Sequence, residues 1–231
     1  MRVSQFEIYR LIQRAMEALG AGYGVDRDAA RCVAWLQARG LPGLAAFDSE
    51  LPRLEAGLPA ARIQSRGEGE LVIEAGGSAL ASAGAVLDLA VTAGRLRLQG
   101  CTTPLFLIPG AAEAAKNYPL SLAWRIAAGE VLLAFGDGPT LFLAPGTDIR
   151  SALLAEPRGD VVIGRAAAVP PQAAPALTAE TLVARLDESL NKGITVDLEL
   201  WRRLDAVAAR VQVPASETSR EKGAGGGDAN T

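Results

Sequence analysis

The sequence predicts an α+β fold in which a central, mostly antiparallel sheet is covered by helices from both ends of the chain. Residues 70–165 contain nearly all of the sheet-like patterns. Apolar residues recur at helical spacing before and after that stretch. The central apolar runs follow one another closely along the chain, which favours antiparallel pairing over a parallel βαβ sheet.

Changes in composition divide the 231 residues into five regions. They are an N-terminal helical region (1–58), a central β-rich region (59–168), a Pro-rich linker (169–177), two C-terminal helices (178–213) and a flexible Gly-rich tail (214–231). Because the chain is 49% hydrophobic, it can bury a substantial core.

The N-terminal region predicts a small bundle of helices. Ser4 and Glu7 have the spacing of a capping box, in which each side chain satisfies a backbone N–H group of the other residue. Asp26 is expected to be the N-cap of a second helix. The apolar residues between Leu44 and Leu54 predict a short third element.

The central region is expected to hold about six or seven strands. The clearest is Ser121–Ala127, where apolar residues alternate with Ala and Arg. Gly-rich and Pro-containing intervals predict hairpins between neighbouring runs, and two short runs are expected at the margins of the sheet. The hairpin pairs are Glu130–Phe135 with Thr140–Ala144 and Arg95–Gln99 with Leu105–Ile108; the marginal runs are Leu71–Ile73 and Val161–Ile163.

Helices are also expected between and after the strands, at residues 78–94, 111–117 and 148–156. Thr178 is a predicted N-cap, and the following helix is expected to turn Leu182, Val183, Leu186 and Leu190 inward until Gly193. Asp197 is predicted to open the last helix.

The bulk properties exclude several classes of function. The net charge of -3 gives no basic surface for nucleic acid or an anionic membrane. No apolar stretch approaches the ~20 residues of a membrane helix, and the N-terminus lacks the apolar core of a secretory signal. Two isolated cysteines, Cys32 and Cys101, fit a cytoplasmic protein with reduced thiols.

The chain contains no histidine, no spaced cysteine set and no Gly-rich phosphate loop, so no common motif predicts a reaction. Several residues could still carry chemistry, and each has a plainer structural interpretation. Cys101 is a candidate nucleophile without a histidine to activate it. Arg125 and Arg165 are possible anion contacts on the sheet, although an arginine between apolar strand residues usually faces solvent. Asp48, Glu50 and Asp88 could bind a hard metal ion, but helix capping and exposure to solvent explain these acids more simply. Lys116, Asn117 and Tyr118 are residue types found in catalytic sites, but adjacent residues in one short helix or turn do not face a common point.

The tail combines polar side chains with a run of glycines. Ser216, Glu217, Ser219 and Arg220 offer hydrogen bonds and a charge, and the glycines let the backbone approach a ligand closely. The segment is either a solvated terminus or a binding segment that orders on a ligand or a neighbouring subunit, with Arg220 pairing a carboxylate or phosphate.

The chain also resembles two known families. The runs Glu17–Val25 and Ala34–Gly43, together with the tail Val213–Gly225, resemble a family of uncharacterised bacterial proteins, the domain of unknown function 3726. The N-terminal helices are also similar to the malate and lactate dehydrogenases of the non-Rossmann type, whose comparable helices lead to a Gly-x-x-Ser-His-Gly motif. Here Gly43–Asp48 occupies that place and Phe47 stands where the histidine would be, so the acid/base chemistry of those enzymes does not transfer.

Three hypotheses about function follow. The first, which the absence of an acid/base set favours, is a non-catalytic cytoplasmic protein that binds a protein partner or forms a homo-oligomer, such as an accessory subunit of a metabolic enzyme. The second is a small-molecule-binding protein with a pocket between sheet and helices. The third is an oxidoreductase-like enzyme using carboxylate, Lys or Arg chemistry. No cofactor and no metal site are predicted, and the sequence leans away from an enzyme.

Overall fold

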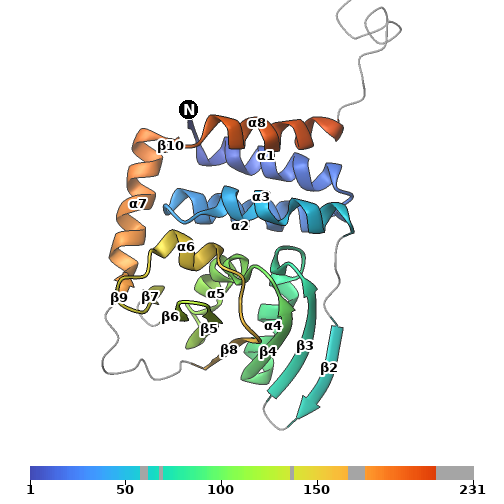
Figure 1. Ribbon diagram of the computed structural model, residues 1–231, viewed down its shortest axis with the longest axis vertical. Coiled ribbons are helices and arrows are strands. Elements are labelled where there is room, and N and C mark those ends of the chain that lie inside the picture. Colours follow the sequence, from blue (N-terminus) through green and yellow to red (C-terminus); the bar gives the residue numbers. More distant parts are fainter. Residues whose placement is uncertain (58–61, 68–69, 136–137, 166–174, 212–231) are drawn as a thin grey trace, which may run out of the picture.

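The computed structural model describes residues 1–57, 62–67, 70–135, 138–165 and 175–211, and it has an α+β fold. Helices from both ends of the chain form a layer that lies against a mostly antiparallel central sheet, as Figure 1 shows. The predicted fold class is therefore confirmed. Residues 169–174 of the expected linker and the whole expected tail lie outside the described residues, while Pro175–Leu177 form strand β9.

The helical layer contains α1 (Gln5–Ala18), α2 (Val25–Ala38), α3 (Gly43–Glu55) and α8 (Leu198–Ala208). The capping box of α1 is present, because the Glu7 N–H donates to Ser4 Oγ at 3.1 Å and the Ser4 N–H donates to the Glu7 carboxylate at 2.7 Å. The expected N-cap at Asp26 is wrong. Gly24 holds that position, and Asp26 is buried in the first turn, where it accepts hydrogen bonds from the Gln13 side chain and the Gly24 N–H.

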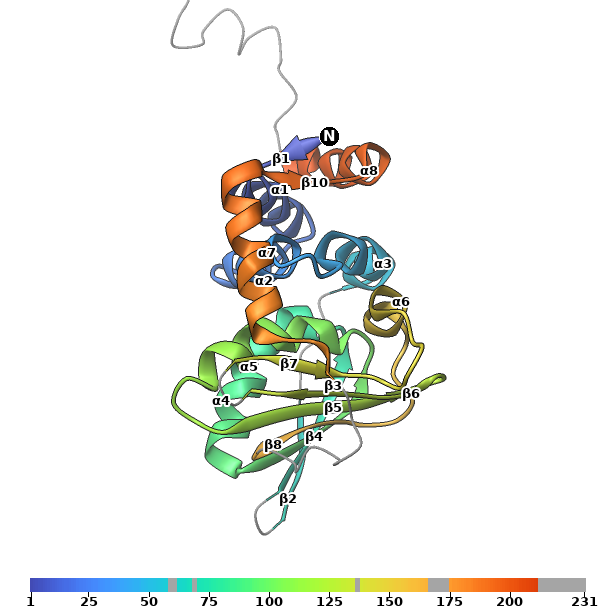
Figure 2. The ribbon, with the colours of Figure 1, turned by 90° about the vertical axis from the view of Figure 1, so that its left-hand side faces the viewer.

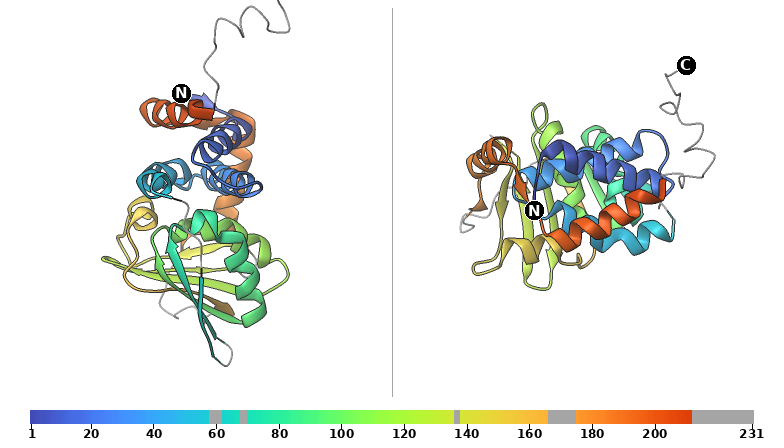
Figure 3. Two further views of the ribbon diagram at one scale, coloured as in Figure 1. Left: turned by 90° about the vertical axis from the view of Figure 1, so that its right-hand side faces the viewer. Right: turned by 90° about the horizontal axis from the view of Figure 1, so that it is seen from above.

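The end of the described chain returns to its beginning. Strand β10 (Ile194–Thr195) pairs with β1 (Arg2–Val3), and α8, which Asp197 caps as predicted, lies along α1. An ion pair between Arg203 and Asp48, at 2.6 Å, joins α8 to α3. Figure 3 shows this layer from the side and from above, stacked on the part of the molecule that holds the sheet.

The main sheet has eight strands in the described residues, in the order β2-β3-β4-β8-β5-β6-β7-β9. Among the described strands only β3 and β4 pair in parallel, and their connection crosses through the 3₁₀ turn η1 (Ala79–Ala81) and helix α4 (Ala83–Ala93). Besides β9, the strands are β2 (Arg62–Gly67), β3 (Glu70–Gly77), β4 (Arg95–Cys101), β5 (Leu120–Ile126), β6 (Gly129–Ala134), β7 (Thr140–Phe142) and β8 (Val161–Arg165).

Three expectations for this region are wrong. The run Leu105–Ile108 is not a strand paired with β4; it forms the 3₁₀ turn η2 (Pro104–Leu107) and the start of α5 (Ile108–Ala114), which also begins before the expected helix at residue 111. Strand β8 is not marginal but lies between β4 and β5, and β3 is covered at the edge by β2. A run of four apolar residues fits a strand or a buried helical turn equally well, and Pro104 favours the turn because it needs no backbone N–H there.

The two faces of the sheet differ. Helices α4 and α5 contact strands β3, β4, β5 and β8. Along β5 the side chains of Leu122, Trp124 and Ile126 are buried, whereas Arg125 between them is exposed on the opposite face. This is the alternation that the sequence predicted.

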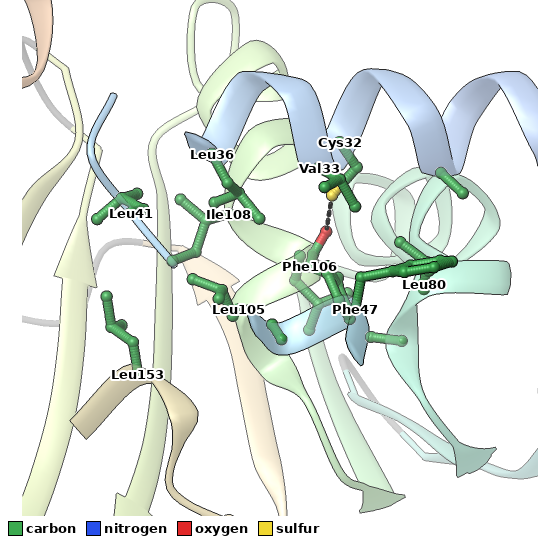
Figure 4. Close-up of a cluster of buried hydrophobic side chains, with 14 of the residues drawn as sticks. Cys32, Val33, Leu36, Leu41, Phe47, Leu80, Leu105, Phe106, Ile108 and Leu153 are labelled. Atoms are coloured by element: carbon green, nitrogen blue, oxygen red, sulfur yellow. Dashed lines mark hydrogen bonds between the residues drawn. The ribbon is translucent and has the colours of Figure 1, made fainter. Parts of the chain in front are cut away.

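The core is continuous between the helical layer and the sheet (Figure 4). Phe47 on α3 lies among Leu105 and Phe106 of η2 and Leu36 of α2, all fully buried. The Cys32 thiol donates to the Phe106 carbonyl oxygen at 3.2 Å. The apolar run Leu105–Ile108 is thus buried because it fills the space between the two layers.

Helix α7 (Ala179–Lys192) runs along one side of both layers, as Figure 2 shows. Thr178 caps it as predicted, and Leu182 is buried. The expectation that Val183 and Leu190 also face inward is wrong, because they are 56% and 64% exposed. The helix packs on the end of α2 by one edge only, where Ser189 Oγ donates to the Ala38 carbonyl oxygen at 2.7 Å.

Candidate functional site

A cavity of about 390 Å³ lies where α2, α5, the β6–β7 connection and the first turn of α7 meet. Figure 2 shows these elements around the lower half of α7. The volume is within the range of small-molecule pockets, about 300–1,000 Å³. Its lining is mostly apolar, with a few charged groups; it comprises Trp35, Arg39, Ala112, Glu113, Ala115, Lys116, Phe135, Gly138, Pro139, Ala179, Leu182 and Val183.

The end of α2 supplies the polar centre of the cavity. Trp35 and Arg39 are one helical turn apart, so their side chains lie on the same face of α2. The Arg39 guanidinium lies 4.0 Å from the centroid of the Trp35 ring, and its Nη1 donates to the Trp35 carbonyl oxygen at 3.3 Å. Stacking and hydrogen bonding therefore hold the guanidinium in one place.

The charge of Arg39 is not neutralised by a neighbour. Among the residues that the structure describes, no carboxylate forms an ion pair with it. Burial lowers the pKa of Arg39, because desolvation disfavours its charged form, yet a guanidinium stays protonated at any pH a protein tolerates. The cavity thus contains a half-buried positive charge with N–H donors to spare.

The opposite rim carries a second cation that already has a partner. Lys116 follows α5, and its Nζ lies 2.6 Å from the Glu113 carboxylate. Both side chains are mostly exposed, so this pair is screened by water and contributes little to the field inside the cavity. The neighbouring Asn117 and Tyr118 are exposed and do not line the cavity, so the three adjacent candidates do not form one site.

The apolar walls come from segments far apart in the chain. Phe135 is buried at the end of β6, Leu182 is buried on α7, and Val183 stands exposed at the rim. Gly138 lets the β6–β7 connection approach α7, because a Cβ there would lie only 2.7 Å from the Ala179 Cβ, and its φ of 126° also favours glycine. The resulting surface suits a ligand with an apolar body and an anionic group.

The structure separates the other predicted anion contacts. Arg125 lies with Arg95 and Arg97 in a shallow cleft on the open face of the sheet, where Glu70 and Asp160 already pair with the latter two. Arg165 is exposed at the other end of β8, opposite Leu120, and does not face the same point. The predicted tail contacts Ser216, Glu217, Ser219 and Arg220 lie outside the described residues.

The remaining candidates have structural roles. Cys101 is buried at the end of β4, and burial raises the pKa of its thiol to about 12, which disfavours the nucleophilic thiolate. Asp48 pairs with Arg203. Glu50 is buried and accepts hydrogen bonds from Thr102, Thr103 and Arg53. In the described part of the chain, no three His, Cys, Asp or Glu side chains are grouped to hold a metal ion.

Phe47, which stands in the place of the dehydrogenase histidine, lies in the apolar core. Its side chain is fully buried and belongs to the hydrophobic cluster of which Figure 4 shows a part. The position that would supply a proton donor in the similar enzymes is therefore sealed from solvent and from ligands in this chain.

Residues 3–84 match a protein family of unknown function, DUF3726. This confirms the resemblance of the N-terminal helices, and the region includes Trp35 and Arg39. No curated protein matches the chain.

Solved structures resemble the whole fold. A dehydrogenase from Sinorhizobium meliloti has a TM-score of 0.67 at 15% identity, covering 90% of this chain and 99% of that chain. The sulfolactate dehydrogenase from Methanocaldococcus jannaschii has a TM-score of 0.64 at 11% identity, covering 90% of this chain and 96% of that one. The malate dehydrogenase from Pyrococcus horikoshii OT3 has a TM-score of 0.62 at 12% identity, with coverages of 92% and 96%. The similarity to dehydrogenases noted for the N-terminal helices thus extends to the fold of nearly the whole chain.

Arg39 was not among the residues that the sequence predicted for a site. The signal that could have found it is the Trp-x-x-x-Arg spacing at the end of an amphipathic helix, directly before Gly40. Among the residues that the structure describes, no helix combines the length and apolar character needed to cross a bilayer.

Proposed function

We propose that this protein binds a small organic anion in the cavity at the end of α2, without histidine-based catalysis. The observation that carries the proposal is the Arg39 guanidinium, stacked on Trp35 and lacking a carboxylate partner in the described residues, beside apolar walls. A fixed guanidinium binds a carboxylate through two parallel N–H···O bonds. Leu182 and Val183 would then contact the apolar part of the ligand and exclude water around the charge pair.

The ligand class that fits best is a small carboxylate. Two of the similar structures are named for sulfolactate and malate, both of which carry carboxylate groups. The same fold with Phe47 in the core and no histidine in the chain supports binding without an imidazole proton donor. The protein would hold and orient the acid without changing it chemically.

Binding is tested by titrating the intact protein with lactate, malate and phenylacetate and following the melting temperature and the heat of binding. A ligand at about 100 times its dissociation constant stabilises the folded state by about 2.7 kcal/mol. We expect Arg39→Gln to weaken binding about tenfold or more, since it removes a charge-assisted pair. Arg202→Gln on α8 is the matched control, because Arg202 is exposed and remote from the lining residues.

Equal stabilisation of the wild type and the Arg39→Gln variant by these acids would contradict the proposal. Consumption of an acid by the pure protein, monitored in the same samples, would instead favour the oxidoreductase-like alternative with carboxylate, Lys or Arg chemistry. The two results are separable because binding and turnover are measured on different signals.

A second candidate, favoured by a specific surface, is partner binding as an accessory subunit of a cytoplasmic metabolic enzyme or as a homo-oligomer. Val183 at the rim of the cavity and Leu190 further along α7 are both exposed, and Phe6 at the start of α1 is 69% exposed. Isolated apolar side chains on a surface are common, but two on one helix suit a contact.

The test is the mass of the protein in solution and its co-purification from its own host. Leu190→Glu is expected to abolish any complex that uses α7, and deletion of residues 215–231 any complex that uses the tail. A complex that survives both changes would refute both surfaces.

A further inference from the structure

A second cleft, of about 280 Å³, lies on the other side of α7 from the Arg39 cavity. Figure 2 shows α5 on one side of α7 and α6 (Ile149–Leu154) on the other. The cleft is bounded by the end of α2, its connection to α3, the start of α6 and the middle of α7. Its lining residues are Gln37, Gly40, Leu41, Pro42, Asp148, Ile149, Arg150 and Arg185.

Two arginines from separate elements border this cleft. In the described part of the chain neither Arg150 nor Arg185 forms an ion pair with a carboxylate. The single acid of the lining, Asp148, is the N-cap of α6, and its carboxylate accepts the Ser151 N–H at 2.8 Å. The lining therefore carries two positive charges against one carboxylate that is already hydrogen-bonded.

The backbone of Gly40 fixes the place of one of these arginines. Gly40 has a φ of 70°, which favours glycine, and it turns the chain at the end of α2. A Cβ at this position would lie 3.1 Å from Arg185 Cδ and 3.3 Å from Nη1, so the half-buried arginine rests directly on the bare glycine. Leu41 and Pro42 are buried beside it and leave the guanidinium as the polar group of this wall.

We propose that Arg150 and Arg185 together bind a doubly charged oxyanion, such as a phosphate group, in the cleft between α6 and α7. Each guanidinium presents several N–H donors in a plane, which match the paired oxygens of phosphate or of a dicarboxylate. A dianion bound by both arginines would neutralise the two positive charges of the lining. The site is distinct from the Arg39 cavity, because the two linings share no residue and α7 lies between them.

Arg185 also has a simpler role that the test must separate from binding. It lies at the C-terminal end of α2, where a positive side chain interacts favourably with the helix dipole. Loss of that interaction lowers stability with or without an anion. Loss of the anion site instead removes the response to the anion, and this loss is expected when either Arg185 or Arg150 is replaced.

The experiment titrates the intact protein with inorganic phosphate, malonate and acetate at constant ionic strength and follows the amide NMR signals of the lining residues. We expect saturable shifts at Gly40 and Ile149 with phosphate in the millimolar range. Arg150→Gln and Arg185→Gln should each weaken binding about tenfold, whereas Arg202→Gln should leave it unchanged. Added salt should weaken it further.

Malonate competing with phosphate would show a site for compact dianions generally, whereas failure of malonate to compete would restrict it to phosphate; both results support the proposal. Acetate binding as tightly as phosphate would overturn it, because one charge would then suffice. Absence of saturable phosphate binding, or binding that survives both substitutions in proteins with wild-type spectra, would also overturn it.

Discussion

Replacement of Thr103 by valine tests the polar contact that joins the helical layer to the sheet. Glu50 on α3 is 1% exposed, and its carboxylate accepts hydrogen bonds from Thr102 and Thr103, which follow β4, and from Arg53. Valine keeps the branched shape of threonine but removes the hydroxyl donor, so the buried carboxylate loses one of its partners.

The expected cost follows from this geometry. A hydrogen bond to a charged group contributes about 1.5–3 kcal/mol, and Thr103 is itself buried, so we expect a loss of about 2 kcal/mol. For a chain of this size, each kcal/mol changes the melting temperature by about 2–4 °C, which gives a decrease of about 4–8 °C. Thr102→Val should cost less, because its bonds to the two Glu50 oxygens are long, 3.2 and 3.3 Å, and its side chain is only partly buried.

Urea unfolding of the intact protein measures the loss, with an unchanged slope showing that the same surface unfolds. Thr92→Val is the matched control, because its exposed hydroxyl donates only to backbone carbonyls within α4, and it should stay within about 0.5 kcal/mol of the wild type. Adding Glu50→Met to Thr103→Val should cost less than the sum of the two single changes. Equal stabilities of Thr103→Val and Thr92→Val, or strict additivity with Glu50→Met, would refute the reasoning.

Three further predictions concern the core and the turn at the end of α2. Phe47→Ala should lower the free energy of unfolding by about 3–5 kcal/mol, measured in urea, because it leaves a cavity between the layers; a loss under about 1 kcal/mol would contradict the burial of the ring. The Cys101 thiol, whose pKa burial raises to about 12, should react with a thiol reagent at pH 8 only as fast as the protein unfolds, and rapid labelling of the native protein would show the thiol to be accessible. Gly40→Ala should cost about 1–2 kcal/mol from its positive φ and more from the displacement of Arg185, whereas Gly20→Ala, with a φ of 81° and nothing within 4 Å, should cost only the first part; equal costs in thermal melts would show that Arg185 does not rest on Gly40.

Local signals in the sequence predicted local structure well. The Ser4 capping box and the Thr178 and Asp197 N-caps are all present, because each depends on residues within one turn. Asp26 shows the limit of such signals. The same carboxylate that could cap α2 is drawn into a buried hydrogen bond with Gln13 of α1, a contact that no local pattern contains.

Non-local structure could not be predicted in the same way. The run Val161–Ile163 contains nothing that distinguishes the middle of a sheet from its margin, yet β8 pairs with both β4 and β5. The parallel pairing of β3 and β4 depends on α4 crossing between them, and a helix predicted there did not by itself specify the pairing. The order of the strands depends on which strand faces pack together in the core, and a single short apolar run in the sequence does not show its packing partner.

The candidate site depends on the same long-range packing. Trp35 and Arg39 fall within residues 3–84, which match the DUF3726 family model, but the cavity exists only because α7, far along the chain, lies over the end of α2. The same helix places Arg185 on Gly40 in the second cleft. Leu182 is the one buried residue of α7, so the helix is held mainly along the side that faces α2. On that side Ser189 Oγ donates to the carbonyl oxygen of Ala38. A ligand in either cleft would add contacts to α7, so binding of the two anions should be coupled through this weakly anchored helix, and each ligand should alter the affinity for the other by the same factor.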